Sequence, residues 1–406
     1  MTTLLYEDFA HAYVTEVGEA IRRMLPRGTE AVDLLARATA DGGEIRAFGN
    51  GGSSAIVRSA LLQLHTQAGV PVNDSMMSPA TLAYSAQRDE FRTAFARSLA
   101  RDIDRVRLVV VASVSGRSAN ILEATRLCAE HRVPVLALVG GDGTQMEPAD
   151  GMVWATGTTD QQISEDAMLT VLTLAAATVP DPDTEPLLTR AERHLHAVSA
   201  VDAELLGAFL REATEAVADA IRNRRRIYVL CPDGGPLALA GEHFAHNLAW
   251  DAPLGVDGVQ PPLVVCDPSL ADMSAVYNDH PDPAHGVRHQ LSSAGPEDVV
   301  FLLAYDSASR TTREAVNVAT VAGTRLFLLH RDGPGCSGAR ARDFRLPRVD
   351  DFALAALVQS VAHLLCRTTR ATLTADRSGP AAVLSPDALM AQDLAPLREL
   401  SDTPFL

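Results

Sequence analysis

The sequence contains the same strand–turn–helix pattern twice. One copy, "GEIRAFGNGGSSAIVRSALLQL", begins at Gly43, and the other, "RRIYVLCPDGGPLALAGEHFAHNL", begins at Arg225. Two further segments, which begin at Arg107 and Asp298, each read as an apolar strand, a hydroxyl-rich turn, a helix and a second apolar strand. Apolar strands that alternate with helices indicate a parallel sheet covered by helices on both faces. A repeat of this length predicts a duplicated α/β domain rather than a solenoid.

A Pro- and Asp-rich stretch, "PDPDTEPLL", separates the two copies and is typical of a linker. We therefore expect one domain at residues 1–180 and a second at residues 181–370. The composition changes again after residue 370, which predicts a C-terminal tail at residues 371–406.

Composition limits the kind of ligand. The chain has 406 residues and a formal net charge of −16, which argues against binding to nucleic acid or to an anionic membrane surface. The printed sequence contains no lysine, so Schiff-base chemistry on a lysine amine is excluded. The cysteine count of five is odd and there is no CxxC, which indicates neither a disulfide framework nor a thiolate zinc site. The N-terminus carries acidic residues early, and the longest apolar run, "MLTVLTLAAATV", is too short to span a bilayer. We expect a cytoplasmic protein with a small-molecule ligand.

Two turns in the first half have the composition of an anion-binding site. "FGNGGSSA" and "SVSGRSAN" each follow a predicted strand and open a predicted helix. Backbone N–H groups at a helix N-terminus and nearby hydroxyls bind phosphate well. The alternative is that the serines only cap their helices. Because ligands bind at the carboxyl ends of the strands in such sheets, the presence of both turns in one repeat favours a binding site.

The first half resembles the sugar isomerase (SIS) fold, and within it the sedoheptulose 7-phosphate isomerase branch. The motifs that carry the resemblance are "GNGGSS", "SVSGRSANILEA", "LVGGDGTQM" and "TTDQQISED". The resemblance implies two doubly wound SIS domains, each a five-stranded parallel sheet flanked by helices, arranged as an internal pseudo-dimer or assembled as a homo-oligomer such as a dimer. It implies a sugar-phosphate substrate, with the phosphate on the three serines of the second turn. The substrate-binding residues that it implies in this half are Asn50, Gly51, Ser53, Ser113, Ser115, Ser118 and Asn120.

The first half departs from the family at its acid–base positions. Ser59 and Gln63 stand where the family has a His and a Glu, and Ser164 and Leu172 stand where its late helix has a Gln and a His. None of these four side chains titrates near neutral pH. The first half therefore keeps the predicted cradle and lacks the predicted acid–base groups.

The second half shows the opposite pattern. Asp233 and Pro236 replace the Asn and Ser of the first turn, and Asp306 stands where a phosphate-binding serine would lie. A carboxylate there repels phosphate. In contrast, "GEHFAHN" places His243 and Asn247 at the family's His and Glu positions if one inserted residue is allowed.

Four residues of the second half are candidate catalytic groups. Glu242 and His246 form a second pair four residues apart on the same helix, and the late helix places His363 at the family's second histidine, with Gln359 one turn before it. We predict catalytic roles for Glu242, His243, His246 and His363, and a divalent metal site, for example for zinc, at Glu242, His243 and His246. The alternative is that the first two histidines lie on a solvated or interface face and His363 is a satisfied core residue. The "YNDH" segment resembles a family segment that lines the sugar pocket, and it adds Asn278 and Asp279 as substrate-binding candidates.

These patterns predict an aldose–ketose isomerase that acts on a phosphorylated sugar through an enediol or enediolate. Sedoheptulose 7-phosphate or a related heptose or octose phosphate is the expected substrate. The first half would supply the phosphate cradle and the second half the acid–base groups. Three alternatives stay open: a non-catalytic regulatory protein that binds sugar phosphates, an aminosugar isomerase of the tandem SIS type, whose lysine chemistry is unavailable here, and a lyase or epimerase that uses the same enediol chemistry.

Overall fold

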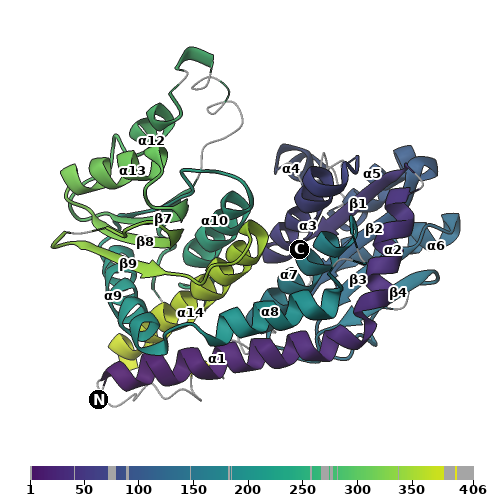
Figure 1. Cartoon of the computed structure of the whole chain (residues 1–406), viewed down its shortest axis with the longest axis horizontal. Coiled ribbons are helices and arrows are strands. Elements are labelled where there is room, and N and C mark those ends of the chain that lie inside the picture. Colours follow the sequence, from purple (N-terminus) through teal and green to yellow (C-terminus); the bar gives the residue numbers. More distant parts are fainter. Residues whose placement is uncertain are drawn as a thin grey trace. The chain divides into compact units, whose positions relative to one another are not determined.

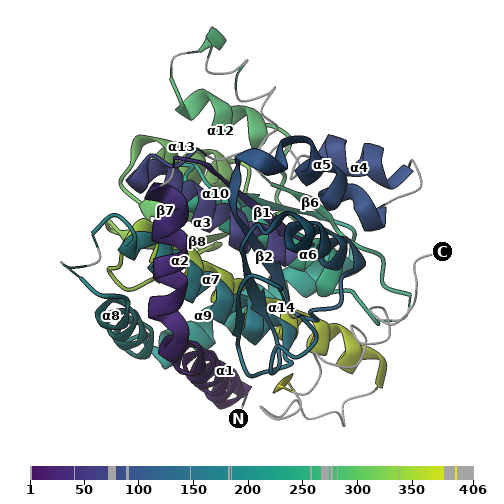
Figure 2. The same ribbon diagram turned by 90° about the vertical axis from the view of Figure 1, so that its right-hand side faces the viewer.

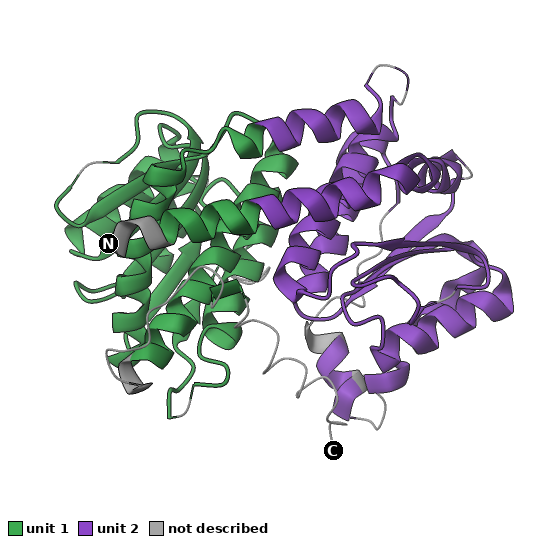
Figure 3. Cartoon of the chain, turned by 90° about the horizontal axis from the view of Figure 1, so that it is seen from below, with its two compact units in different colours: residues 1–14, 197–406 green, residues 15–196 purple. Residues whose placement is uncertain are grey.

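The computed structural model describes residues 2–40, 42–71, 79–87, 91–146, 148–181, 183, 185–256, 258–266, 274, 278–280, 282–336, 338–378 and 389–390. Its internal contacts divide the chain into two compact units (Figure 3): unit 1 comprises residues 1–14 and 197–406, and unit 2 comprises residues 15–196.

Unit 2 is built on a parallel sheet in the order β1-β2-β3-β4 (Figure 1). Its strands are β1 (Glu44–Gly49), β2 (Val106–Ser113), β3 (Val135–Val139) and β4 (Gly151–Ala155). Its helices are α2 (Gly28–Ala40), α3 (Gly52–Ala68), α4 (Pro79–Gln87), α5 (Ala94–Asp102), α6 (Ala119–His131), α7 (Gln161–Thr178) and most of α8 (Leu187–Ser199), with short 3-10 turns at Leu25–Arg27, Phe91–Thr93 and Ile103–Arg105.

Alternation along the buried strands separates the two faces of this sheet. Val109 and Val111 face a core shared with α5 and α6, in which Phe48 stacks on Phe95 at 4.8 Å between ring centroids. The ribbons of α5 and α6 can be followed in Figure 2. The opposite face is covered by α2, α3 and α7. A near-continuous apolar strand such as "LVVVA" is what a sheet covered on both faces requires. The predicted doubly wound architecture is confirmed.

Unit 1 contains a five-stranded parallel sheet in the order β6-β5-β7-β8-β9. Phe301 and Phe327 stack at 5.2 Å between ring centroids on the face covered by α9, α10 and α14, whereas α12 and α13 cover the other face. The strands are β5 (Arg226–Leu230), β6 (Leu263–Val265), β7 (Val299–Asp306), β8 (Arg325–Asp332) and β9 (Ala341–Arg345), and the helices are α9 (Ala203–Arg222), α10 (Pro236–His246), α12 (Ala284–Gln290), α13 (Arg310–Val321) and α14 (Asp351–Ser378), with a π-helical turn, η5, at Asn247–Asp251.

The prediction of five strands in each half is correct for unit 1, but the described residues of unit 2 supply four. In unit 1 the edge strand β6 follows the helix that opens at the Gly-Gly turn. The matching stretch of unit 2 follows α3 and includes residues 72–78, which lie outside the described residues. The predicted pseudo-dimeric arrangement stays a prediction.

Three predicted boundaries differ from the structure. The predicted division after residue 180 lies after residue 196 instead, because most of α8 groups with unit 2. Residues 1–14 group with unit 1, because α1 (Thr2–Met24) is a long helix whose first turns bury Tyr6, Phe9 and Tyr13. The expected tail from residue 371 is also displaced, since α14 continues to Ser378.

The helix α14 is apolar enough to resemble a membrane span. Residues 351–375 of α14 have the length and composition to cross a bilayer: an 18-residue window within them has a mean hydropathy of 1.3, and 94% of that window is buried. The apolar run "MLTVLTLAAATV", on which the sequence prediction was based, belongs to α7 and not to α14. The apolar character of α14 is that of a buried core helix.

Candidate phosphate cradle and histidine cluster

The turn between β1 and α3 brings the backbone very close to itself. Gly51 adopts φ 52° and ψ −131°, a conformation that favours glycine. A Cβ atom on Gly49 would lie 2.4 Å from the carbonyl oxygen of Ser53. Glycine is therefore required at positions 49 and 51 of this turn, which ends β1 and starts α3 without a capping side chain.

The turn between β2 and α6 presents hydroxyl groups. Ser113 ends β2, and its Oγ lies 3.2 Å from the Oγ of Ser118. Ser118 occupies the N-cap position of α6, yet its side chain makes no capping hydrogen bond. Ser115 is exposed, and its Oγ accepts a hydrogen bond from the backbone N of Arg117 at 3.2 Å. The alternative that the Ser118 hydroxyl serves only as a helix cap is thus not supported.

A reciprocal amide pair joins the two turns. The Nδ2 of Asn50 donates to the Oδ1 of Asn120, and the Nδ2 of Asn120 donates to the Oδ1 of Asn50, both at 2.9 Å. The register of β1 and β2 brings the two turns together, because Gly49 and Ala112 pair near the carboxyl ends of these strands. The buried Ser53 lies in the first turn of α3. Unit 2 therefore brings the predicted residues of both turns together at the carboxyl edge of one sheet. We call this group (Asn50, Gly51, Ser53, Ser113, Ser115, Ser118 and Asn120) the cradle.

The next loop of the same sheet edge carries a carboxylate. The backbone N and the hydroxyl of Thr144 both donate to Asp142, at 3.0 and 2.8 Å, and hold the pKa of that carboxyl below its ordinary value. The exposed Asp142 therefore stays anionic and orders the loop after β3.

The predicted gap in acid–base chemistry is visible in unit 2. Ser59 and Gln63 are buried on α3, and the Nε2 of Gln63 donates to Gln67 at 3.4 Å. Ser164 donates to the carbonyl of Thr158 at 2.9 Å, and Leu172 is fully buried. These four side chains fill the core of unit 2 and offer no group that titrates near neutral pH.

The clash at Gly49 yields a test of the cradle's backbone. We expect Gly49→Ala to lower the free energy of unfolding by about 1–3 kcal/mol, because backbone rather than a flexible side chain opposes the new methyl group. Gly18→Ala is the matched control: its Cβ would meet only side-chain atoms at 3.5 and 3.6 Å, and alanine favours the helix by about 0.5–1 kcal/mol. Chemical denaturation of both variants decides the matter, and equal stability of the two would contradict the turn geometry.

The corresponding site in unit 1 is filled by the protein itself. Asp233 accepts hydrogen bonds from Ser309 at 2.9 Å, from Thr311 at 2.5 Å and from Thr312 at 3.3 Å. Sequence reasoning assigned the loss of phosphate binding to repulsion by Asp306. The structure adds a more direct reason, since the carboxylate of Asp233 already uses the hydroxyls that a phosphate would need.

Two buried histidines meet in the core of unit 1. The Nδ1 of His243 lies 2.8 Å from the Oε1 of Gln359, and the Nδ1 of His363 lies 3.3 Å from the hydroxyl of Tyr13. The two imidazole rings are 5.0 Å apart and nearly perpendicular. Because an amide oxygen only accepts, Gln359 fixes a proton on the Nδ1 of His243 and leaves its Nε2 as the basic atom of the neutral ring.

The predicted metal ligands are not brought together. His243 is buried on α10, whereas Glu242 and His246 are exposed on the same helix. Among the described residues, these three do not form a group whose ligand atoms all lie within 4.8 Å of one another. Successive helical residues point about 100° apart, which separates Glu242 from His243. The described residues therefore give no support to these three side chains as one ligand set, and the zinc site stays a prediction.

Two residues near the histidines were not predicted to matter. Tyr13 belongs to the amphipathic α1, and nothing in the sequence distinguishes it from other core aromatics. Asn247 is fully buried at the start of η5, and neither atom of its side-chain amide has a hydrogen-bond partner in the described part of unit 1. The only signal for it in the sequence is its alignment with the family's Glu.

The "YNDH" candidates lie on the surface of unit 1. Asn278 and Asp279 are exposed, and the Nδ2 of Asn278 donates to Asp279 at 2.9 Å. The neighbouring His280 stacks on His285 at 3.7 Å. Desolvation, followed by the charge of His280, lowers the pKa of His285. Much of the segment, residues 267–273 and 275–277, lies outside the described residues.

Comparison with known proteins agrees with this geometry. Residues 6–140 match the model of the SIS domain. The matched residues include both turns of the cradle. The phosphoheptose isomerase of Thiobacillus denitrificans is 28% identical over 168 residues, which cover 39% of this chain and 85% of the relative.

Solved structures show that the likeness in fold extends over both halves of the chain. A candidate phosphosugar isomerase from Clostridium difficile 630 superposes with a TM-score of 0.58 at 14% identity, covering 92% of this chain and 96% of its own. The C-terminal domain of glucosamine-fructose-6-phosphate aminotransferase from Francisella tularensis gives a TM-score of 0.56 at 13% identity, covering 90% and 96%. At these identities the likeness concerns the fold alone.

Proposed function

We propose that this protein isomerises a phosphorylated sugar between its aldose and ketose forms. The observation that carries the proposal is the cradle, in which Ser113 and Ser118 present paired hydroxyls beside a helix N-terminus whose N-cap side chain makes no capping hydrogen bond. The similarity to a phosphoheptose isomerase favours sedoheptulose 7-phosphate, or a related heptose or octose phosphate, as the substrate.

The cradle has the donors that a phosphate dianion needs. Hydroxyl groups and N–H groups at the start of a helix donate to phosphate oxygens, and the positive end of the helix dipole favours the negative charge. Local donors of this kind bind phosphate even though the chain carries a net charge of −16. The amide pair of Asn50 and Asn120 offers further donors to sugar hydroxyls.

Isomerisation requires a base and an acid near the carbonyl of the open-chain sugar. The base removes a proton from carbon 1 of the ketose, and that electron pair forms the double bond between carbons 1 and 2 while the carbonyl electrons move to the oxygen on carbon 2, which the acid protonates. A proton then returns to carbon 2 while the hydroxyl on carbon 1 gives up its proton, which yields the aldose. His243 and His363 are the candidates for this exchange, because an imidazole can both accept and donate a proton. Glu242 and His246 are exposed on α10 and gain no support as partners of His243.

A second candidate function is non-catalytic binding of a sugar phosphate. It is favoured by the buried, non-titrating Ser59, Gln63, Ser164 and Leu172 in unit 2. A regulatory protein would keep the cradle and need no proton transfer. The cytoplasmic location and the homo-oligomeric state stay predictions from the sequence.

Proton exchange distinguishes the two functions. We would incubate the purified chain with sedoheptulose 7-phosphate in D2O and follow the sugar by NMR. Deuterium at carbon 1 or carbon 2 together with a new aldose signal is expected for the isomerase. Thermal stabilisation by the sugar without exchange would instead identify a binding protein. If the sugar gives no exchange and no stabilisation, this substrate is rejected, and other ketose phosphates would then be screened.

The cradle itself is tested by Ser118→Ala. We expect the KM, or the dissociation constant of the non-reacting sugar phosphate, to rise about tenfold, because one hydrogen bond to a charged group is lost. Ser292→Ala removes an exposed hydroxyl that bonds the carbonyl of His289, and it should leave binding unchanged. An unchanged KM in Ser118→Ala would show that the phosphate binds elsewhere.

A further inference from the structure

Unit 1 contains a cavity at the end of its sheet opposite to the Asp233 turn. Arg224 precedes β5 by two residues, and Gln260 precedes β6 by three, so both lie at the amino ends of parallel strands. Asp233, in contrast, follows the carboxyl end of β5. The cavity has a volume of about 340 Å³ and is lined by Ile221, Arg222, Arg224, Gly258, Val259, Gln260 and Leu373.

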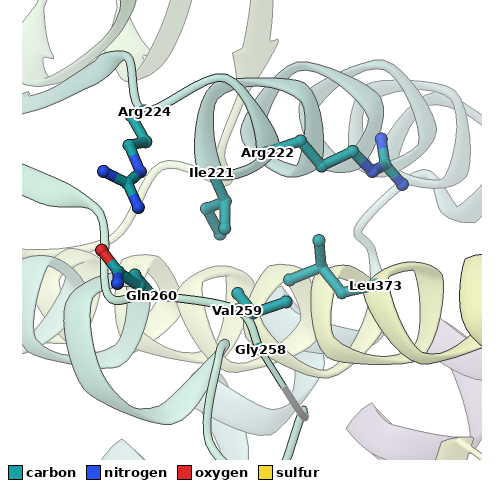
Figure 4. A pocket seen from close by; sticks show the side chains of 7 residues that line it. All are labelled: Ile221, Arg222, Arg224, Gly258, Val259, Gln260 and Leu373. Atoms are coloured by element: carbon teal, nitrogen blue, oxygen red, sulfur yellow. The ribbon is translucent and has the colours of Figure 1, made fainter.

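The lining separates an apolar floor from a polar mouth. Ile221 and Leu373 are buried, and Val259 is half-buried beside them. Arg224 and Gln260 are exposed, and the guanidinium of Arg224 extends towards the Gln260 amide (Figure 4). The guanidinium of Arg222 points away from both (Figure 4), so only its stem contributes to the wall.

The polar groups at the mouth are uncommitted. In the described part of the chain, neither the guanidinium of Arg224 nor the amide of Gln260 has a hydrogen-bond or ion-pair partner. Neighbouring arginines do: Arg226 donates to the carbonyl of Ser293 at 2.8 Å, and Arg325 pairs with Asp219 at 2.9 Å. An unpaired guanidinium beside an apolar cavity is notable in a chain with a net charge of −16.

The left-handed backbone conformation of Arg224 recurs at Arg132, which provides a matched control position. Arg224 has φ 53° at the end of α9, where its N donates to the carbonyl of Ile221. Arg132 has φ 57° at the end of α6, and its N donates to Ala129 in the same way. The left-handed conformation is thus a way of ending helices in this chain, and glycine would adopt it readily at both positions.

We propose that this cavity binds a small organic anion, a carboxylate or a phosphate monoester with an apolar body of a few carbon atoms. A guanidinium binds either head group through two parallel hydrogen bonds, and the Gln260 amide can add a third. The floor of Ile221, Val259 and Leu373 removes the apolar body from water. The volume falls at the small end of the range for metabolite sites, about 300–1,000 Å³. This site is separate from the cradle and does not depend on the proposed isomerase activity.

The test uses two anions with similar apolar bodies. Binding of 4-methylpentanoate and of butyl phosphate to the full-length chain would be measured by calorimetry, with neutral 4-methylpentanamide as the uncharged comparison. We expect both anions to bind and the amide to bind about tenfold more weakly or not at all. Arg224→Gly should weaken both anions about tenfold or more. Arg132→Gly, the matched variant at the other helix end, should match the wild type.

Ser118→Ala distinguishes binding at this cavity from binding at the cradle. Binding of 4-methylpentanoate should be the same in this variant as in the wild type. The proposal is overturned if neither anion binds, if Arg224→Gly binds as well as Arg132→Gly, or if only butyl phosphate binds and Ser118→Ala abolishes it. In that last outcome the anion occupies the cradle, and Arg224 serves only the negative end of the α9 dipole.

Discussion

Replacing His363 by glutamine is expected to lower the rate of proton exchange into the sugar by about 10²–10⁴-fold, the usual contribution of a general acid or base. His363 is fully buried on α14, with its ring 5.0 Å from that of His243. Glutamine preserves polarity and most of the volume but cannot exchange a proton near neutral pH. The loss should fall on kcat and leave KM within a few-fold, because the cradle is untouched.

Two variants separate proton transfer from packing. Tyr13→Phe removes only the hydroxyl that lies 3.3 Å from the Nδ1 of His363, and it should cost a small part of the rate. His289→Gln replaces an exposed histidine on α12 and should have no effect. Thermal melts would confirm that each variant is folded. A folded His363→Gln variant that exchanges at the wild-type rate would remove His363 from the mechanism.

Replacing Asp233 by alanine should destabilise unit 1 by about 1.5–3 kcal/mol or more, the value of a hydrogen bond to a charged group. Three hydroxyls, those of Ser309, Thr311 and Thr312, lose their common acceptor. The carboxylate occupies the place in unit 1 that corresponds to the proposed phosphate site of the cradle. An added anion should therefore replace it.

Phosphate rescue tests this interpretation of Asp233. Millimolar inorganic phosphate should raise the melting temperature of Asp233→Ala by more than that of the wild type, because an anion that binds only the folded state stabilises it. Glu130→Ala, which removes an exposed ion pair with Arg126, should change the stability by less than about 1 kcal/mol and show no such rescue. A wild-type-like Asp233→Ala, or an equal response to phosphate in all three proteins, would contradict the assignment.

The sequence alone determined the fold class and the composition of the cradle. Apolar strands such as "LVVVA" and "VVFLLA" have a period and length that suit only sheets covered on both faces, and the glycines at 49 and 51 are required by a turn that no larger residue fits. The residues of such a site follow directly after strands, so local pattern is enough to place them at one edge. The meeting of Asn50 with Asn120 follows from the register of β1 and β2.

Tertiary structure decided what depends on orientation and on distant partners. Packing separates three residues that are nearly adjacent in sequence, Glu242, His243 and His246. It buries His243 and leaves the other two exposed, so the structure does not bring the predicted zinc ligands together. Tyr13 reaches His363 only because α1 packs in unit 1, far from its place in the chain. The capture of three hydroxyls by Asp233 and the cavity at Arg224 likewise join segments that are remote in sequence. Spacing along a chain fixes which residues share an element, but only packing fixes which side chains meet.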